Sequence, residues 1–331
     1  MFYDKDCDKN LLKNKIVTVI GYGSQGHAQA QNLKDSGIKT FVCLKENSKK
    51  INKAIEDGFE VINIDKTILI SDIIVILIPD EDQRELYYNY IEKKINSNKT
   101  IIFSHGFNIH YKQIIPRNDL NIILVAPKAP GHTVRSTFVE GSGVPSLIGI
   151  YQDYNKNSLR IALSYAMCIG SGRVGIIATN FKEETETDLF GEQAVLCGGV
   201  SSLIICGFET LVESGYSPDL AYFECLHEMK LIVDLIYEGG IKNMRFSISN
   251  TAEYGDYYVL NNFYYSIFKK KMKKILKNIQ NGDFSKSFIL DKNSNFIKLN
   301  LFKNYYSNHL IEIVGNKIRS LFNWKHKKII N

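Results

Sequence analysis

The sequence predicts an α/β domain built on a parallel sheet, followed by a helical domain. Up to about residue 180, short β-branched runs alternate with helix-like segments, the pattern of parallel strands connected by helices. Beyond that point, apolar residues recur with the 3.6-residue period of helices. The length of 331 residues exceeds one typical core and agrees with two domains. We therefore expect domains over residues 1–179 and 180–326 and a basic tail over residues 327–331.

The composition is that of an ordinary globular protein, with 44% hydrophobic and 23% charged residues. The net charge of +6 comes from scattered lysines without the aromatic-interleaved stripe of a nucleic-acid-binding surface. The six cysteines form no C-x-x-C pair, so we expect reduced, buried thiols. The N-terminus lacks a signal-peptide pattern, and Glu209 and Glu213 argue against a membrane helix over the apolar stretch near them. We expect a cytoplasmic protein that binds neither nucleic acid nor a membrane.

The first predicted strand, Lys15 to Ile20, leads directly into a glycine-rich turn, Gly21-Tyr-Gly-Ser-Gln-Gly26. A helix-like segment, His27 to Lys34, follows the turn, and this context makes G-x-G-x-x-G a dinucleotide-binding signature. The first glycine makes the tight turn, the second lets the backbone approach a pyrophosphate, and the third allows close helix packing. The N-terminus of the helix favours the phosphates, so we predict a Rossmann domain.

The next predicted strand, Lys39 to Leu44, ends where an NAD-specific domain would carry an acidic residue for the ribose 2′-hydroxyl. Here the chain instead carries Lys45, Ser48 and the neighbouring lysines, which favour a 2′-phosphate. We therefore expect NADPH in preference to NADH, with Glu46 opposing this preference.

Three further predicted strands, residues 71–79, 100–104 and 121–125, are apolar runs typical of buried parallel strands. Polar segments follow all three strands: Asp80-Glu81-Asp82-Gln83, His105-Gly106-Phe107-Asn108 and the loop from Ala126 to His132. Ligands bind at this carboxyl edge in open parallel sheets, so we expect a cleft there. The position of His105 directly after a buried strand makes it the best histidine candidate for chemistry.

Two pairs of carboxylates in the helical domain, Asp188 with Glu192 and Glu224 with Glu228, are each spaced by four residues. On helices, this spacing places both members of a pair on one face. In their apolar surroundings the carboxylates would repel one another unless compensated, and their hard oxygen ligands suit Mg²⁺, Mn²⁺ or Ca²⁺. The alternative is a solvated helix face, since exposed like charges at this spacing cost only about a few tenths of a kcal/mol.

Six segments follow one another in a specific order: Gly21 to Ala28, Pro79 to Gln83, Ser104 to Phe107, Ala126 to Arg135, Glu186 to Gln193 and Ser249 to Tyr257. Together they resemble the ketol-acid reductoisomerase (acetohydroxyacid isomeroreductase) family, in its short class I form, from about residue 10 to Trp324. The resemblance implies an α/β Rossmann N-terminal domain and an all-α knotted C-terminal domain. It also implies that the helices intertwine with a second subunit, in a homodimer or a higher assembly of dimers.

The resemblance further implies a set of residues for each ligand. The NADPH site would comprise Tyr22, Gly23, Ser24, Gln25, Lys45, Ser48, Asp80, Glu81, Asp82, Gln83 and Gly131. The catalytic residues would be His105 and Lys128, the ligands of two Mg²⁺ ions would be Asp188, Glu192, Glu224 and Glu228, and Ser249 would contact the substrate carboxylate. The second carboxylate pair and the serine would come from the partner chain, so a monomer would be inactive. Lys45 stands where the family usually has arginine, and its point charge would weaken 2′-phosphate discrimination.

The activity implied by the resemblance is alkyl migration in 2-acetolactate or 2-aceto-2-hydroxybutyrate followed by NADPH reduction, in valine, leucine and isoleucine biosynthesis. Two Mg²⁺ ions would polarise the carbonyl and stabilise the alkoxide. One alternative is an NADP-dependent 2-hydroxyacid or β-hydroxyacid dehydrogenase, which needs no metal. Another is a binding protein that keeps the fold without the activity. The choice between the two substrates, which differ by one methylene, stays open.

Overall fold

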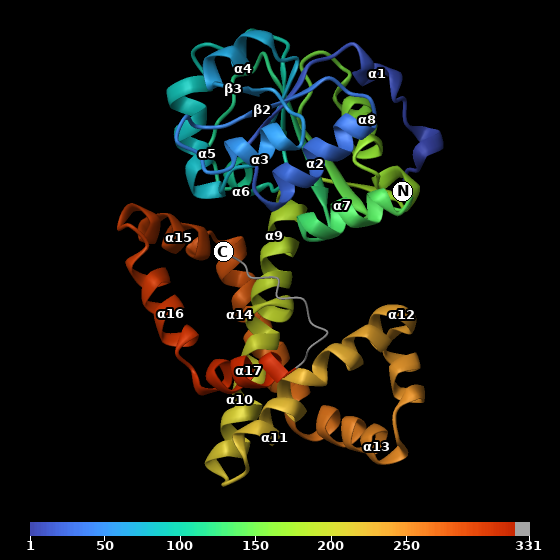
Figure 1. The fold of residues 1–331 in the computed structure, drawn as a ribbon, viewed down its shortest axis with the longest axis vertical. Helices are drawn as coiled ribbons and strands as arrows, with labels where there is room; N and C mark the ends of the chain where they lie inside the picture. Colours follow the sequence, from blue (N-terminus) through green and yellow to red (C-terminus); the bar gives the residue numbers. More distant parts are fainter. Residues whose placement is uncertain (322–331) are drawn as a thin grey trace. The chain divides into compact units, whose positions relative to one another are not determined.

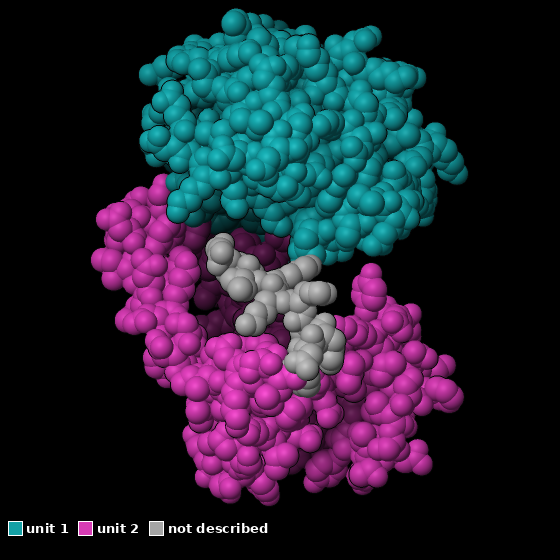
Figure 2. Space-filling model, viewed as in Figure 1, with its two compact units in different colours: residues 1–187 teal, residues 188–331 magenta. Residues whose placement is uncertain are grey.

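The computed structural model describes residues 1–321 and divides the chain into two compact units (Figure 2). The first, which we call the α/β unit, is Met1–Thr187, and the second, the helical unit, begins at Asp188. The division falls within helix α9 (Phe181–Gly191). The expected basic tail, residues 327–331, lies outside the described residues.

The α/β unit, coloured from blue to yellow-green in Figure 1, contains an eight-stranded sheet. The strand order is β3-β2-β1-β4-β5-β6-β7-β8. The strands are β1 (Val17–Ile20), β2 (Thr40–Cys43), β3 (Val61–Ile62), β4 (Ile73–Ile76), β5 (Thr100–Phe103), β6 (Asn121–Pro127), β7 (Ser146–Gln152) and β8 (Ile176–Thr179). All pairings are parallel except that of β6 with β7. Ile20 pairs with Cys43 on one side and Ile76 on the other, and Ile76 pairs with Phe103. The carboxyl ends of these strands are therefore level, as the sequence predicted for the cleft edge.

The central strands of this sheet are buried at every position, because helices cover both faces of the sheet. The helices are α1 (Asn10–Lys13), α2 (Ser24–Asp35), α3 (Ile51–Glu56), α4 (Ile64–Ile70), α5 (Asp80–Leu86), α6 (Phe107–His110), α7 (Gly131–Val139), α8 (Ser158–Cys168) and α9, with shorter turns η1 (Asp4–Asp6), η2 (Tyr87–Ile91) and η3 (Ser171–Arg173). Val17 and Val19 of β1 pack with Leu33 of α2 and Tyr165 of α8. Ile76 of β4 belongs to a second core cluster. The two clusters lie on opposite faces of the sheet, because successive side chains of a strand point to alternate faces.

The helical unit confirms the prediction of a helical second domain. Its elements are η4 (Glu192–Leu196), α10 (Gly198–Glu213), α11 (Pro218–Tyr222), η5 (Phe223–His227), α12 (Met229–Ser247), α13 (Asn250–Val259), η6 (Leu260–Tyr264), α14 (Tyr265–Gln280), α15 (Asp283–Asn293), α16 (Ile297–Ser307) and α17 (Leu310–Leu321). A small apolar cluster joins α10, α11 and α17, around Phe208, Tyr222 and Ile311. Within the described residues, α12, α13 and α16 bury no residue of their own.

One continuous helical stretch, Phe181–Glu213, is long and apolar enough to cross a membrane by length and composition, with a mean hydropathy of 1.9 in its most apolar window. Core helices of soluble proteins meet the same criterion, so this is weak evidence of a membrane span. All six cysteines are free, and Cys43 and Cys168 are buried as expected. Cys197 and Cys206 are exposed, contrary to the expectation, because little of this chain packs over the helical stretch that carries them.

Candidate functional site

The glycine-rich turn has the backbone geometry that its sequence predicts. Gly21 adopts φ 103°, and a Cβ there would lie 2.6 Å from the carbonyl oxygen of Leu77, so this position requires glycine. A Cβ on Gly26 would lie 2.3 Å from the carbonyl oxygen of Gly21, so the third glycine permits close packing of α2. Gly23 has nothing within 4 Å of its Cβ position. The backbone at Gly23 is therefore open to a ligand, as the motif requires.

A cavity of about 510 Å³ lies beside this turn. It is lined by Tyr22, Gly23, Ser24, His27, Lys50, Lys53, His132, Arg135 and Ser136. Three predicted cofactor residues are among them, and Lys50 is one of the lysines expected beside the 2′-phosphate. The sequence analysis did not place Lys53 and Arg135 there. Cationic side chains beside a helix N-terminus suit a phosphorylated ligand. A Cβ on Gly131, the first residue of α7, would lie 2.1 Å from the carbonyl oxygen of Ser24, so glycine lets α7 approach the turn.

Asp57 organises the polar side chains next to the cavity. Its carboxylate accepts hydrogen bonds from the Tyr22 hydroxyl at 2.8 Å and the Lys53 ammonium at 2.7 Å, and His27 Nε2 lies 3.3 Å away. Burial alone would raise the pKa of Asp57, but the hydrogen bonds from Lys53 and Tyr22 outweigh it and lower that pKa. Burial lowers the pKa of His27, which favours the neutral ring. Asp57 therefore offsets part of the positive charge that Lys53 brings to the cavity.

Lys45 and Ser48 lie in the short loop between β2 and α3. The Ser48 amide donates to the Lys45 carbonyl at 2.9 Å, and the Ser48 hydroxyl accepts from the Lys50 amide at 3.3 Å. Lys45 is exposed and Ser48 half-buried, and neither lines the cavity, whereas Lys50 does. The loop thus keeps the two predicted 2′-phosphate residues within one turn and extends its positive charge to the cavity.

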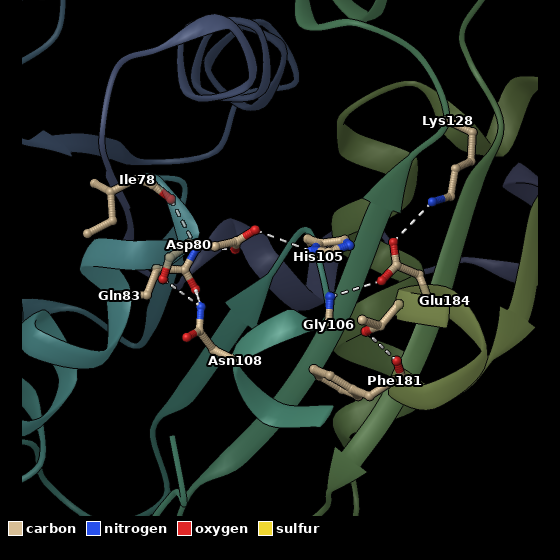
Figure 3. A network of polar contacts seen from close by, with 10 residues as sticks. Ile78, Asp80, Gln83, His105, Gly106, Asn108, Lys128, Phe181 and Glu184 are labelled. Atoms are coloured by element: carbon tan, nitrogen blue, oxygen red, sulfur yellow. Dashed lines mark hydrogen bonds and ion pairs between the residues drawn. The ribbon is translucent and has the colours of Figure 1, made fainter. Parts of the chain in front are cut away.

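The first turn of α5 carries the predicted cofactor residues that follow β4. They are Asp80, Glu81, Asp82 and Gln83. The Gln83 amide donates to the Ile78 carbonyl at 3.0 Å and to the Asp80 carboxylate at 3.1 Å (Figure 3). The Asn108 amide donates to the Gln83 side chain at 3.0 Å and to the Asp80 carbonyl at 2.9 Å. These bonds tie the loop after β4 to the loop after β5.

The predicted catalytic residues His105 and Lys128 lie after neighbouring strands, β5 and β6. His105 Nδ1 lies 3.3 Å from the Asp80 carboxylate. The Lys128 ammonium donates to Glu184 at 3.0 Å, and the other Glu184 oxygen accepts from the Gly106 amide at 2.9 Å (Figure 3). Glu184 is only 1% exposed, and a buried carboxylate needs such partners to offset its lost hydration. Glu184 thereby connects the two predicted catalytic loops.

Glu184 is absent from the residues that the sequence analysis proposed for the site, because the run from Glu183 to Glu186 by itself is typical of the acidic start of a helix. One ring nitrogen of His105 and one carboxylate oxygen of Glu184 lie within 4.8 Å of each other. A signal was present in the spacing, since Glu184 precedes Asp188 by four residues, as Asp188 precedes Glu192. Three carboxylates at this spacing define one face of a helix.

A π-turn follows the first predicted metal-binding pair directly, and another contains most of the second pair. Glu192 opens η4, whose wide turn is closed by the Cys197 amide donating to the Glu192 carbonyl at 3.0 Å. Glu224 lies in η5, where the Glu228 amide donates to the Phe223 carbonyl at 3.1 Å. The interval from Asp188 to Glu192 keeps the regular α-helical spacing, because it lies in α9 and ends where η4 begins. The interval from Glu224 to Glu228 falls within the π-turn, so the assumed spacing is interrupted at the second pair. Single π-turns within helices are frequent at functional sites.

Ser249 is the N-cap of α13, and its hydroxyl accepts from the Ala252 amide at 3.2 Å. The first turn of a helix favours an anion, which agrees with a role near a carboxylate. Among residues 1–321, Glu192, Glu224 and Glu228 belong to no group of three or more potential metal ligands. A single chain therefore does not bring the two carboxylate pairs together in its described part.

Two family models together match most of the chain. Residues 11–175 match "Acetohydroxy acid isomeroreductase, NADPH-binding domain", and residues 181–324 match "Ketol-acid reductoisomerase, C-terminal domain". The chain is also similar to a solved structure of an NADH-preferring ketol-acid reductoisomerase from an uncultured archaeon. That match has 44% identity and a TM-score of 0.92, and it covers 97% of this chain and 99% of the other.

More distant structures share the fold alone. A putative oxidoreductase from Jannaschia has 11% identity and a TM-score of 0.60, over 80% of this chain and 97% of its own. A semialdehyde dehydrogenase NAD-binding protein from Cupriavidus necator has 14% identity and a TM-score of 0.59, over 81% of this chain and 99% of its own. The matched family has the fold of a soluble enzyme. The chain belongs to the ketol-acid reductoisomerase family, whose members are nicotinamide-dependent oxidoreductases of branched-chain amino acid biosynthesis.

Proposed function

We propose that the protein converts 2-acetolactate and 2-aceto-2-hydroxybutyrate to the 2,3-dihydroxy-3-methyl acids, by a Mg²⁺-dependent alkyl migration and a reduction by NADPH. The observation that carries this proposal is the position of Glu184. Its buried carboxylate joins Lys128 to the loop of His105, at the sheet edge where the glycine-rich turn also ends. The same helix continues into Asp188, the first of the proposed metal ligands.

The donor set fits magnesium. Asp188 and Glu192 offer hard carboxylate oxygens on one helical stretch, and Glu224 and Glu228 offer two more. When bound, two Mg²⁺ ions supply Lewis-acid catalysis to the migration, and the nicotinamide supplies the hydride. We assign all four carboxylates to the metal site, with the second pair from a second copy of the chain.

The protein's own groups then orient and stabilise the substrate. Lys128, fixed by its bond to Glu184, supplies positive charge beside the substrate oxygens. His105, beside Asp80, orients bound water at the carboxyl edge of β5. Ser249 binds the substrate carboxylate at the N-terminus of α13, where helix dipole and free N–H groups add to its hydroxyl. Glu228 accepts a hydrogen bond from the substrate hydroxyl.

The proposed cofactor is NADPH, because the loop after β2 carries Lys45 and Ser48 and the adjoining cavity carries Lys50 and Lys53. The similar archaeal enzyme prefers NADH, so the choice requires direct measurement. Arginine would form a planar fork with a phosphate, whereas Lys45 offers a point charge, which predicts a moderate preference.

The proposed assembly is a homodimer, or a higher assembly of such dimers, in the cytoplasm. Support comes from the apolar side chains that the helical unit leaves exposed, including Tyr237 at 91% and Phe246 at 88%. A second copy would cover them and complete the metal site with Glu224 and Glu228. Obligate interfaces of this kind are large and apolar.

The decisive assay is oxidation of NADPH with 2-acetolactate, with and without Mg²⁺. We expect turnover that EDTA abolishes and Mg²⁺ restores. A simple hydroxyacid dehydrogenase would be insensitive to EDTA, and a binding protein would show no turnover under any condition. Either result would remove the proposal.

Glu192→Gln should lower this turnover by at least about 100-fold and leave NADPH binding intact, because it removes a metal ligand. The matched control is Glu213→Gln, the same substitution at an exposed position on the same helical stretch. Normal turnover in Glu192→Gln would contradict the assignment of the metal site.

A further inference from the structure

A buried chain of polar side chains runs from α8 to the loops of the site. The Tyr165 hydroxyl donates to Gln29 Oε1 at 2.8 Å, and both residues are 0% exposed. Gln29 Nε2 donates to Gln25 Oε1 at 3.0 Å and to the Ser104 hydroxyl at 3.2 Å. The Gln25 amide in turn donates to the Ala129 carbonyl at 2.9 Å. Both ends of the Gln29 amide are thus engaged within the protein.

The chain ends beside both proposed catalytic residues. Ser104 immediately precedes His105, and Ala129 immediately follows Lys128. Gln25 lies in the first turn of α2 and belongs to the glycine-rich segment, Gly21 to Gly26. One buried amide, that of Gln29, therefore contacts the cofactor-side helix and the loop after β5 directly. It reaches the loop after β6 through Gln25.

Burying the Gln29 amide costs more free energy than burying an apolar side chain at the same position would. A buried amide without partners loses about 1–3 kcal/mol, and the neighbouring buried positions of α2 include Ala28, Ala30 and Leu33. Tyr165 determines which way the amide points, because a hydroxyl that donates to Oε1 leaves Nε2 directed toward the site loops. Burial raises the pKa of Tyr165, which keeps this hydroxyl protonated as a donor.

We propose that Gln29 is a positioning residue, held by Tyr165, that sets the loops of His105 and Lys128 relative to the N-terminus of α2. The inference rests on the proposed catalytic roles of those two residues. Gln29 touches no reacting group in this proposal and acts through the backbone segments on either side of the site. Small displacements of catalytic groups have large effects on turnover, which makes such a residue measurable.

The test replaces Gln29 with methionine, which keeps the length of the side chain and removes its hydrogen bonds. We expect Gln29→Met to lower kcat by about ten- to a hundredfold, because the two loops lose their common anchor. The KM for NADPH should stay within about twofold, since Gln25 keeps its bond to the Ala129 carbonyl and the Gly21 amide keeps its bond to the Cys43 carbonyl. The pH titration of the His105 ring, followed by NMR, should also shift.

The matched control is Asn121→Leu, at a buried amide at the opposite end of β6. Asn121 is 0% exposed and accepts from the Asn155 amide at 3.1 Å and the Ser158 hydroxyl at 3.3 Å. We expect a comparable loss of thermal stability with kcat within about twofold of the wild type. If Gln29→Met also lost only stability, with kcat and the His105 titration unchanged, the inference would be overturned.

Two further variants keep the test decisive if Gln29→Met does not fold. Tyr165→Phe removes only the hydroxyl that orients the amide, and Ser104→Ala removes only the bond to the His105 loop. Both should lower kcat, and both leaving it unchanged would overturn the inference. If the wild-type protein showed no turnover at all, the proposed function would fail. The His105 titration in Gln29→Met or Tyr165→Phe would then decide the positioning role alone.

Discussion

The two units of this protein differ in how completely one chain buries its apolar residues. In the α/β unit, β1, β4 and β5 are buried at every position. In the helical unit, α12, α13 and α16 bury no residue, and large apolar side chains such as Tyr237 and Phe246 are almost fully exposed. The carboxylates of the proposed site differ between the units in the same way. The Glu184 carboxylate is hydrogen-bonded within the α/β unit, by Lys128 and Gly106. Glu224 and Glu228 join no cluster of potential ligands within residues 1–321.

This difference indicates that the two units are stabilised in different ways. The α/β unit holds its core and its polar site by contacts within one chain. The helical unit leaves apolar area that folding alone does not remove from water, at about 25 cal/mol for each Å² that a partner would bury. We therefore infer that the helical unit depends on association, and the following predictions test this contrast.

The largest effect is expected from charges placed on the exposed apolar surface of the helical unit. Tyr237→Asp with Ile241→Asp puts two carboxylates on α12, and burying them in an interface would be very unfavourable. We expect a monomer in sedimentation, with activity reduced by about 100-fold or more because no second copy completes the metal site. NADPH binding should persist.

The control for that pair is Leu69→Asp with Ile115→Asp, at exposed apolar positions of the α/β unit. These changes should leave assembly and activity unaffected, since that unit already buries its core. Dissociation in the control, or an intact active dimer in the α12 variant, would break the contrast between the units.

A smaller effect is expected at the cofactor loop, which belongs to the α/β unit alone. Lys45→Ala with Ser48→Ala should raise the KM for NADPH about tenfold, by removing charge-assisted bonds to the 2′-phosphate. The KM for NADH and the oligomeric state should not change. Lys39→Ala, an exposed lysine before β2, serves as the control. Equal use of NADH and NADPH by the wild type would show that the interpretation of this loop is wrong.

The smallest effect is a pH dependence of the α/β unit. His110 is largely buried beside Glu186, at 3.3 Å, and burial lowers its pKa below the ordinary 6.5. The unfolded chain, with the ordinary pKa, binds the proton more readily, so stability is complete above pH 6.5 and is lost as the pH falls below it. Urea unfolding should therefore show lower stability at pH 5.5 than at pH 7.5.

His110→Gln should reduce this loss of stability in acid, because it removes one of the groups that must take up a proton. An unchanged pH dependence in the variant would exclude His110 as a source. Unfolding of the helical unit should instead vary with protein concentration, as expected for an associating region.

Much of the α/β unit could be predicted from the sequence because its signals are local. The strand before Gly21, the glycines themselves and the start of α2 are neighbours in the chain, and the structure confirms them. The polar segments after β4, β5 and β6 were predictable for the same reason, since strands that read as buried and parallel bring their carboxyl ends to one edge. The NADPH preference, the metal ligands and the dimer remain predictions that rest on residue type and on the family.

The sequence by itself determined five of the eight strands, the glycine-rich turn and the polar segments that follow β4, β5 and β6, because neighbouring residues specify these features. Only the tertiary structure decided which distant groups meet. Glu184 reaches Gly106 across 78 residues of sequence, and Tyr165 reaches Gln29 across 136. The four-residue spacing of the carboxylates likewise gives no indication of the π-turns that contain Glu192 and Glu224. Such contacts depend on packing across the whole unit, for which no local pattern of residues provides a signal.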